Sequence, residues 1–251
     1  MEPSTVGVCE SCWVRLRPWE GPACEGCGIP FASDRAMDSR PALCALCRRE
    51  EFRFDAARSF GLYSGTLRAL ILQVKFQRRE RLGKRLGRLL TETWRAIEPH
   101  CEGKTPVLIP VPLHASRQRQ RGFNQATLLA RGLAEAVRKV DGGAPLCFDA
   151  SPLLRARPTA PQTGLSLSAR HENVRGAFEV VAPERVRERV ILLVDDVMTT
   201  GATLSACATA LKRAGTRRVL AVTLARSVPL LPDFAGKVPS AAVDDPSREQ
   251  T

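Results

Sequence analysis

Residues 190–203 decide the fold, and they read Val190-Ile-Leu-Leu-Val-Asp195-Asp196-Val-Met-Thr199-Thr200-Gly201-Ala202-Thr203. The first five residues are all apolar and predict a strand, over 190–194, that is buried on both faces. Two carboxylates and a Thr/Gly loop follow, and a helix is expected from 202 to 214, where Gly215 ends it. A buried strand that leads through a short loop into a helix is the repeating unit of an α/β sheet.

The loop after this strand has the composition of a phosphate-binding loop. Backbone N–H groups at the start of a helix bind phosphate, and the loop adds the hydroxyls of Thr199, Thr200 and Thr203. Gly201, just before Ala202, would let the backbone approach a phosphate without a Cβ in the way. These five residues are therefore predicted to hold the phosphate of a ligand.

The adjacent carboxylates of Asp195 and Asp196 are expected at the carboxyl edge of the sheet, where open α/β sheets bind their ligands. The pair would repel phosphate, but it suits sugar hydroxyls and could stabilise positive charge that develops on a ribose ring. We expect both side chains to be partly exposed in a cleft. A sugar beside a phosphate indicates a phosphorylated ribose; the alternative is an ordinary turn between a strand and a helix.

The other elements follow from hydrophobic periodicity. Strands are expected at residues 56–63, 107–111, 177–181 and 218–225, and helices at 66–76, 81–97 and 125–140. Asn124 is expected as an N-cap, and the rest of 146–180 has no regular pattern. Alternating strands and helices with continuously apolar strands predict a parallel sheet that helices cover on both faces.

Six of the nine cysteines occur before residue 48, and all six form Cys-x-x-Cys pairs. Two such pairs can close one tetrahedral zinc site, and the best four ligands are Cys24, Cys27, Cys44 and Cys47. Gly28 would permit the tight turn after a pair. Cys9 and Cys12 are expected to form a second, partial metal site at most.

Metal ligation is favoured over disulfide bonds or redox use because the N-terminus has neither the basic start nor the apolar core of an export signal. Residues 1–50 are predicted to be a small zinc-ribbon module that needs its ion to fold. The three single cysteines are expected to be buried, and they are Cys101, Cys147 and Cys207.

The net charge is +12, and residues 51–140 hold eighteen Lys/Arg against seven Asp/Glu. Such an excess indicates an anionic partner, either nucleic acid or a phosphorylated small molecule, unless it is only a solvated helix face. Four cations fall at positions i, i+3, i+4 and i+7 of the expected 81–97 helix, with only Glu80 close by in sequence. They are predicted to bind single-stranded DNA, and they are Arg81, Lys84, Arg85 and Arg88.

Composition excludes some classes of protein. Hydrophobic residues make up 44% and charged residues 25%, which rules out a chain disordered throughout. No apolar run approaches the length of a membrane helix, so no membrane insertion and a cytoplasmic location are expected. Aromatic residues make up only 5%, which argues against an extensive base-stacking platform. Core packing is favoured for Trp13, Trp19, Phe31 and Phe76.

A second motif lies where the 107–111 strand ends, in the sequence Pro110-Val-Pro112-Leu113-His114, with Arg117, Arg119 and Arg121 after it. Arginine guanidinium groups can bind a diphosphate through several donors at once. The alternative for these arginines is simple exposure on a surface loop. His114 is expected to be either a hydrogen-bonded structural residue or an acid–base group.

These motifs together resemble the ComF family, whose members are related to amidophosphoribosyltransferases and tied to DNA uptake in natural competence. The 190–203 stretch is similar to the signature that binds phosphoribosyl pyrophosphate in type I phosphoribosyltransferases. The family pattern also includes the cysteine pairs, Lys75-Phe76, the 110–125 stretch, Thr159/Gln162 and 170–178. Many members carry four cysteine pairs, whereas this chain has three, which leaves the role of Cys9 and Cys12 open.

The resemblance implies a type I phosphoribosyltransferase fold, a parallel sheet with a small hood, over residues 51–232. Residues 233–251 are rich in Ser, Pro and Asp, so a disordered tail is expected there. The resemblance also implies a pyrophosphate loop, here Pro112, Leu113 and His114 with Arg117 and Arg121, and a lid over 159–178 that carries Arg170. Asp195, Asp196 and Arg170 would be the catalytic residues, and magnesium would arrive with the substrate diphosphate. The chain is then either a transferase acting on phosphoribosyl pyrophosphate, or a non-catalytic protein that senses nucleotides or binds single-stranded DNA.

Overall fold

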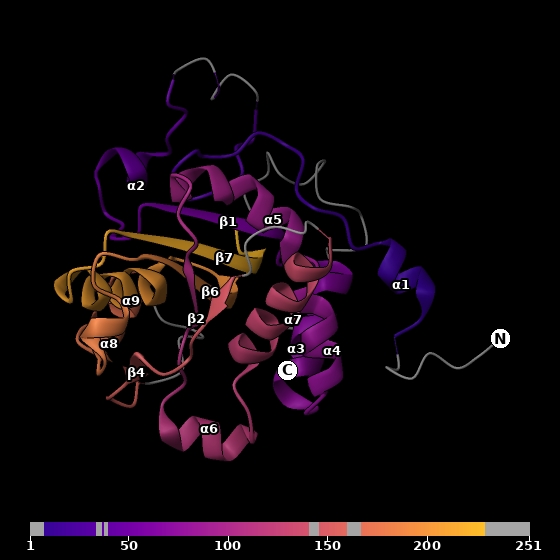
Figure 1. Ribbon diagram of the computed structural model, residues 1–251. Coiled ribbons are helices and arrows are strands. Elements are labelled where there is room, and N and C mark those ends of the chain that lie inside the picture. The colour runs from indigo at the N-terminus through magenta and orange to yellow at the C-terminus, as the bar shows by residue number, and fades with distance from the viewer. Residues whose placement is uncertain (1–7, 34–36, 38–39, 141–145, 160–166, 229–251) are drawn as a thin grey trace, which may run out of the picture.

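The computed structural model describes residues 8–33, 37, 40–140, 146–159 and 167–228. Five parallel strands form the central sheet in the order β1-β7-β6-β2-β3 (Figure 1). The strands are β1 (Ala56–Leu62), β2 (Val107–Pro110), β3 (Cys147–Phe148), β6 (Val190–Met198) and β7 (Arg218–Arg226). The parallel sheet expected from the sequence is confirmed.

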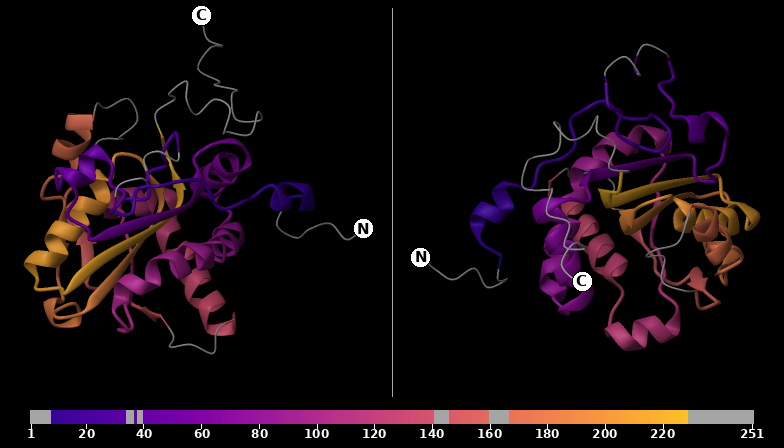
Figure 2. Two further views of the ribbon diagram at one scale, coloured as in Figure 1. Left: turned by 90° about the horizontal axis from the view of Figure 1, so that it is seen from above. Right: turned by 180° about the vertical axis from the view of Figure 1, so that it is seen from behind.

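Helices cover both faces of this sheet (Figures 1 and 2). One core contains side chains of α3 (Gly65–Phe76), α4 (Glu80–Gly87), α5 (Leu90–Ile97) and α7 (Gln125–Val140), and the other contains side chains of α9 (Ala202–Arg213). Alternate residues of β6 enter different cores: Val190, Leu192 and Val194 the first, Ile191 and Leu193 the second. Their burial on both faces explains the unbroken apolar run.

The sequence predicted one helix over residues 81–97, and this prediction is wrong, because the structure has two helices there. Arg88 and Leu89 form a turn between α4 and α5. α4 packs against α7, whereas α5 packs against β1 and β7. One straight helix cannot make both contacts, so tertiary packing overrides a periodicity that continues through the turn.

A small hood follows β3. Strand β4 (Leu153–Arg155) pairs antiparallel with β5 (Phe178–Val180), and helix α8 (Leu167–Val174) lies between them in the chain. β5 confirms the strand expected at 177–181, while β4 and α8 lie in the stretch without a regular sequence pattern. Residues 160–166 of the predicted lid, and the predicted tail at 233–251, lie outside the described residues.

The remaining elements are short: α1 (Glu10–Val14), α2 (Ala45–Arg48), α6 (Ala115–Arg121) and the 3-10 helices η2 (Glu98–Cys101) and η3 (Pro183–Arg185). Asn124 caps α7 as expected, since its Oδ1 accepts a hydrogen bond from the Ala126 N–H at 3.0 Å. Among the described helices, none has the length and apolar character to cross a membrane.

Candidate phosphoribosyl site and metal centre

The acidic pair lies inside β6 rather than after it. β6 continues to Met198 because β7 runs beside it, with Asp195 opposite Thr223 and Met198 opposite Arg226. The Ser227 N–H then donates to the Met198 carbonyl at 3.0 Å and extends this pairing. Both carboxylates are therefore fixed by a strand with neighbours on each side, β7 and β2.

The two aspartates differ in burial, and the expectation of partial exposure is wrong for one of them. Asp195 is half-buried, whereas Asp196 is only 6% exposed. The reason is Lys75 of α3, whose Nζ lies 3.0 Å from Asp196 Oδ2. A buried carboxylate needs such a partner, and a helix on one face of the sheet supplies it.

Asp195 has an unusual protonation equilibrium. Burial, and then the neighbouring Asp196 carboxylate, raise the pKa of Asp195 to about 7. Desolvation lowers the pKa of Lys75, but the Asp196 carboxylate outweighs it, and the pKa of Lys75 is raised. Close to neutral pH, Asp195 can therefore hold or release a proton while Lys75 stays charged.

The loop after β6 turns through Gly201, whose φ of +78° is in the left-handed region. A Cβ at this position would lie 2.7 Å from the Phe52 ring, so packing also requires glycine. The Thr200 hydroxyl is buried and accepts a hydrogen bond from the Ala202 N–H at 3.3 Å. Two hydroxyls, those of Thr199 and Thr203, line the cleft, rather than the three expected.

These groups border an open cleft of about 550 Å³. Its cations come from α3, α6, β4 and α8, and they are Arg68, Lys75, Arg117, Arg121, Arg155 and Arg170. The carboxylates of Asp195 and Asp196 are the acidic groups on its wall. A cleft with six cations and two carboxylates favours an anionic ligand.

The predicted pyrophosphate loop borders this cleft in part. Pro112, Leu113, Arg117 and Arg121 line it, whereas His114 is not among the lining residues. Instead, His114 caps α6: its Nδ1 accepts a hydrogen bond from the Ser116 N–H at 3.3 Å. Of the two alternatives for His114, the structure therefore favours the structural one.

Arg121 is held in place from two sides. Its Nη1 donates to Gln125 Oε1 at 2.9 Å, and its guanidinium lies 5.7 Å from the centre of the Phe76 ring. Phe76 is 71% exposed, so the expectation that it packs in the core is wrong. These contacts orient the guanidinium at the edge of the cleft.

Several cleft residues could not be predicted from the sequence. Arg155 comes from β4, where its guanidinium lies 5.3 Å from the centre of the Phe178 ring and donates to Thr159 Oγ1. Tyr63 and Arg68 follow β1 and also line the cleft. Nothing in their local sequence marks them, because only the fold brings the ends of β1, β4 and β6 together. Arg170 lines the cleft from α8, as the lid interpretation requires.

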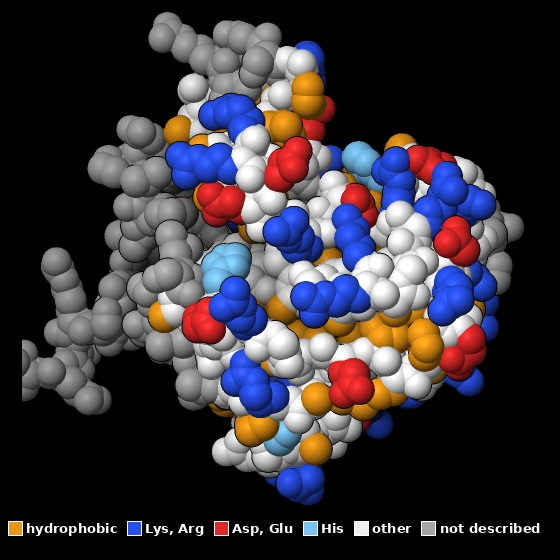
Figure 3. Space-filling view, turned by 90° about the vertical axis from the view of Figure 1, so that its left-hand side faces the viewer, with side chains coloured by type: hydrophobic (Ala, Val, Ile, Leu, Met, Phe, Trp, Pro, Cys, Tyr) orange, Lys and Arg blue, Asp and Glu red, His pale blue; other side chains and the backbone are white. Residues whose placement is uncertain are grey.

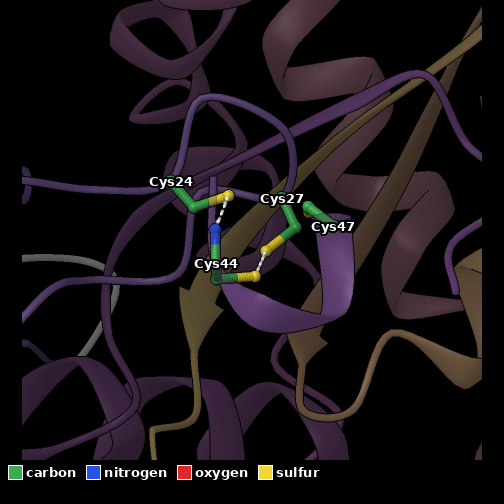
Figure 4. A group of neighbouring side chains, drawn as sticks. All are labelled: Cys24, Cys27, Cys44 and Cys47. Atoms are coloured by element: carbon green, nitrogen blue, oxygen red, sulfur yellow. Dashed lines mark hydrogen bonds between the residues drawn. The ribbon is translucent and has the colours of Figure 1, made fainter. Parts of the chain in front are cut away.

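The four cysteines selected from their spacing come together (Figure 4). The sulfurs of Cys24, Cys27, Cys44 and Cys47 all lie within 4.8 Å of one another. The Sγ atoms of Cys27 and Cys44 are 3.7 Å apart, close to the roughly 3.8 Å that a tetrahedral site with zinc–sulfur bonds of about 2.3 Å requires. The donor set therefore fits a zinc ion. Gly28 has the positive φ of +66° expected after the first pair.

The third cysteine pair stands apart. Cys9 and Cys12 have sulfurs 3.2 Å from each other at the start of α1. In the part of the chain that the structure describes, no third potential ligand joins them. Cys101 and Cys207 are buried as expected, whereas Cys147 is exposed because it lies in the edge strand β3.

The basic face of α4 is less uniform than its sequence predicts. Lys84 Nζ lies 3.6 Å from Glu135 Oε1 on α7, and the Arg85 guanidinium stacks 3.9 Å from the centre of the Trp13 ring. Arg81 and Arg88 are exposed. On the face of the molecule that carries α8 and α9, Lys and Arg side chains are interspersed with Asp and Glu (Figure 3). Of the four cations expected to bind nucleic acid, Arg81 on α4 and Arg88 in the turn after it are therefore the two that stay exposed.

Comparison with known proteins identifies the family of this chain. Residues 121–233 match the family model described as the phosphoribosyl transferase domain. Competence protein F of Haemophilus influenzae is 32% identical over 223 residues, which cover 88% of this chain and 91% of that protein. The chain belongs to the ComF family. DNA utilization protein YhgH of Salmonella typhimurium is 31% identical over 224 residues, with the same shares covered.

A third relative agrees with this assignment, and one solved structure aligns weakly with the chain. Competence protein ComFC of Bacillus subtilis is 28% identical over 230 residues, which cover 88% of this chain and 84% of that protein. Among solved structures, glutamine phosphoribosylpyrophosphate amidotransferase from B. subtilis aligns with a TM-score of 0.34 and 22% identity over 56% of this chain and 25% of that chain. The fold of this ComF protein is that of the phosphoribosyltransferases, with a cysteine cluster before it that can hold a metal ion.

Proposed function

We propose that this ComF protein binds phosphoribosyl pyrophosphate in the cleft and transfers its phosphoribosyl group to an acceptor. The observation that carries the proposal is the convergence of three features in one cleft: the acidic pair, the Thr/Gly loop at the start of α9, and six cations. The alternative of an ordinary strand–helix turn does not account for the cations that other elements add.

The proposal gives each group a role. Asp195 and Asp196 accept hydrogen bonds from the ribose hydroxyls, and the loop from Thr199 to Thr203 holds the 5-phosphate. Arg117 and Arg121 bind the diphosphate, and Arg170 adds a contact from the hood. Magnesium, bound through the diphosphate and ribose hydroxyls, would neutralise the leaving group. Asp196 is already paired with Lys75, so the protein offers no carboxylate cage of its own.

The transfer is a displacement at the anomeric carbon. The bond from that carbon to the diphosphate oxygen breaks while a bond to the acceptor nucleophile forms on the opposite face. The diphosphate leaves with the bonding electron pair, and the acceptor loses a proton. Positive charge that develops on the ribose is stabilised by the acidic pair, provided that Asp195 is ionised.

Calorimetric titration with phosphoribosyl pyrophosphate and magnesium tests this function. We expect saturable binding to wild type and at least tenfold weaker binding to Asp195→Asn, because ribose hydroxyls lose a charged partner. An Asp149→Asn variant is the control, since Asp149 lies outside the cleft, where it bonds Arg185 at 2.9 Å. Equal affinity of wild type and Asp195→Asn would refute the proposed site.

We also infer a second activity, single-stranded DNA binding, from the exposed Arg81 on α4 and Arg88 in the turn after it. The relatives named competence and DNA utilization proteins support a role in DNA uptake. We also propose a cytoplasmic location and DNA-uptake proteins as partners. The division into a module at 1–50 and a domain at 51–232, with zinc in the module, belongs to the same proposal. Binding of DNA without any binding of phosphoribosyl pyrophosphate would favour the non-catalytic alternative.

A further inference from the structure

One wall of the cleft is aromatic. Tyr63 is the one tyrosine of the chain, it is half-buried, and it lines the cleft beside Arg68, Leu72 and Lys75. The Arg68 guanidinium lies 5.9 Å from the centre of the Tyr63 ring. Within the described residues, the Tyr63 hydroxyl has no hydrogen-bond partner and Arg68 has no carboxylate partner. One side of the Tyr63 ring packs against the core, so the wall presents to the cleft a partly exposed ring, a hydroxyl without a partner and a cation without a carboxylate.

The strand order places this wall across from the predicted diphosphate loop. Tyr63 directly follows β1, whereas Pro112 and Arg117 follow β2. β7 and β6 lie between β1 and β2 in the sheet, and β6 carries the acidic pair. The Tyr63 wall and the diphosphate loop therefore flank Asp195 and Asp196 from opposite sides.

This placement matters because displacement at the anomeric carbon is an in-line reaction. A ribose held at the acidic pair, with its diphosphate toward Arg117 and Arg121, would receive its acceptor from the other side. We propose that Tyr63, Arg68 and Leu72 form the acceptor subsite of the cleft. This subsite would bind a planar heteroaromatic ring that carries carbonyl or anionic groups, as nucleobases do. This inference rests on the proposed function.

Each side chain of the wall has a part in recognising such a ring. The Tyr63 ring offers a stacking face, and stacking on an aromatic side chain tolerates different bases. Arg68 offers donors for a carbonyl or anionic group, and Leu72 adds apolar contact. The low aromatic content of the chain is no obstacle, because one ring suffices for a single acceptor.

Calorimetry with ribose 5-phosphate and with the four nucleoside 5′-monophosphates, used as product analogues, tests the subsite in the full chain. We expect at least one nucleotide to bind roughly tenfold or more tightly than ribose 5-phosphate. Tyr63→Leu should abolish this difference without changing the affinity for ribose 5-phosphate, and Tyr63→Phe should keep most of it. Phe148→Leu is the matched control, because Phe148 has Arg131 at 5.6 Å but does not line the cleft.

The outcomes separate the subsite from the proposed function. If ribose 5-phosphate binds and no base adds affinity, or if Tyr63→Leu keeps the difference, the subsite is refuted and the phosphoribosyl site survives. If nucleotides bind in a Tyr63-dependent way while ribose 5-phosphate and phosphoribosyl pyrophosphate do not, the subsite stands and the transferase proposal fails. Absence of all binding refutes both.

A second inference rests on a different observation, the burial of Arg226. Arg226 ends β7 with only 2% of its surface exposed, and its Nε and Nη1 have no hydrogen-bond partner. Its strand neighbour Met198 packs in the same core as Cys24 and Cys27. Burial lowers the pKa of Arg226, and the charges of the four clustered cysteines oppose this shift. Arg58 lies on the neighbouring strand β1, where the Ala57 N–H beside it donates to the Gly26 carbonyl, between Cys24 and Cys27, at 2.8 Å. Burial lowers the pKa of Arg58 too, and the charges of Cys24, Cys27, Glu25 and Cys47 oppose this shift.

A buried guanidinium with two unpartnered nitrogens is costly unless a compensating charge lies nearby. One divalent zinc ion and four thiolates sum to a double negative charge, and Arg226 and Arg58 together carry a double positive charge. We infer that these two arginines are the counter-ions of the metal-bound tetrathiolate. Arg226 also contacts the cleft wall, because the Tyr63 N–H donates to its carbonyl at 2.9 Å.

Metal affinity and stability of Arg226→Met test this inference in the full chain. We expect the affinity for zinc, measured by competition with a chelator, to fall about tenfold. In chelator, the same variant should be more stable than wild type, since it lacks the uncompensated charge. Arg226→Lys, which keeps the charge, should bind zinc more tightly than Arg226→Met does, and Arg217→Gln, at the surface, should match wild type in both tests.

Two results would overturn the counter-ion role of Arg226. One is an unchanged zinc affinity of Arg226→Met. The other is an equal loss of stability with and without zinc, because that result would mean that the side chain only packs. If Arg226→Met does not fold, the zinc affinities of Arg226→Lys and Arg58→Gln are compared instead. An affinity of Arg226→Lys that is no higher than that of Arg58→Gln would refute the role.

Discussion

Lys75 Nζ and Asp196 Oδ2 lie 3.0 Å apart, with 18% and 8% of the two side chains exposed. The lysine comes from α3 and the aspartate from β6, so the pair ties a helix of one face to the strand that carries the site. The positive charge of Lys75 also offsets one of the two adjacent negative charges, so the acidic pair repels an anionic ligand less. Asp195 is left as the carboxylate that can change its protonation within the cleft.

The buried pair predicts a specific pattern of stability. Lys75→Met alone and Asp196→Asn alone should each lower the free energy of unfolding by about 3 kcal/mol, because each leaves the other partner buried without compensation. The double variant should recover much of this loss. Chemical denaturation of the four proteins measures the coupling. Strict additivity of the two losses would contradict the ion pair.

Asp195 predicts a pH dependence of stability. Its pKa of about 7 lies above the ordinary 3.8, so the folded chain binds a proton that the unfolded chain has released. The contribution of Asp195 to stability is therefore largest at low pH and is lost as the pH rises through about 7. Denaturation from about pH 5 to about pH 8 should show wild type losing roughly 1–3 kcal/mol relative to Asp195→Asn. Parallel pH curves would show that the pKa is not raised.

Arg117 and Arg121 predict the affinity for diphosphate. Changing both to Gln should weaken the binding of phosphoribosyl pyrophosphate by at least tenfold, because hydrogen bonds to a charged group are worth about 1.5–3 kcal/mol each. Ribose 5-phosphate, which has no diphosphate, should bind as before. Arg119→Gln is the matched control, since Arg119 lies between them on α6 but is exposed and outside the cleft. A loss of the same size in Arg119→Gln would indicate a general charge effect.

The cysteine cluster predicts about one zinc ion for each chain after dialysis, and a second, partial site at Cys9 and Cys12 would raise this content. Cys44→Ser should lose the ion and expose residues 20–50 to protease, because the ion supplies folding free energy there. Cys147→Ser is the control, since Cys147 is exposed and far along the chain. A zinc-free protein that resists protease over these residues would refute the metal centre.

The basic face of α4 predicts how DNA affinity depends on salt. The change of Arg81 and Arg88 to Gln should flatten the plot of log affinity against log salt by about 0.7 for each phosphate that the variant no longer neutralises. The change of Lys84 and Arg85 should have a smaller effect, because Glu135 and Trp13 already engage these cations. Fluorescence anisotropy with a labelled single strand measures both slopes. Equal slopes for wild type and the first variant would mean a solvated face only.

Short-range features could be predicted from the sequence because each depends on residues close together in the chain. The Cys-x-x-Cys pairs, the capping Asn124, the phosphate loop at Gly201 and the apolar strand 190–194 are all of this kind. A strand buried on both faces needs an unbroken apolar run, and a left-handed turn needs glycine, so the chemistry is visible locally. The cleft residues Arg117 and Arg121 could be predicted through a motif for the same reason.

Only the tertiary structure decided which distant groups meet. Lys75 neutralises Asp196, Glu135 engages Lys84, and Tyr63, Arg68 and Arg155 enter the cleft, although no local pattern predicts any of these contacts. The helix expected over residues 81–97 is also divided in two, because α4 packs against α7 whereas α5 packs against β1 and β7. The reason is physical: the pairing of charges and the burial of a side chain depend on distance in space, and the order of the strands sets that distance.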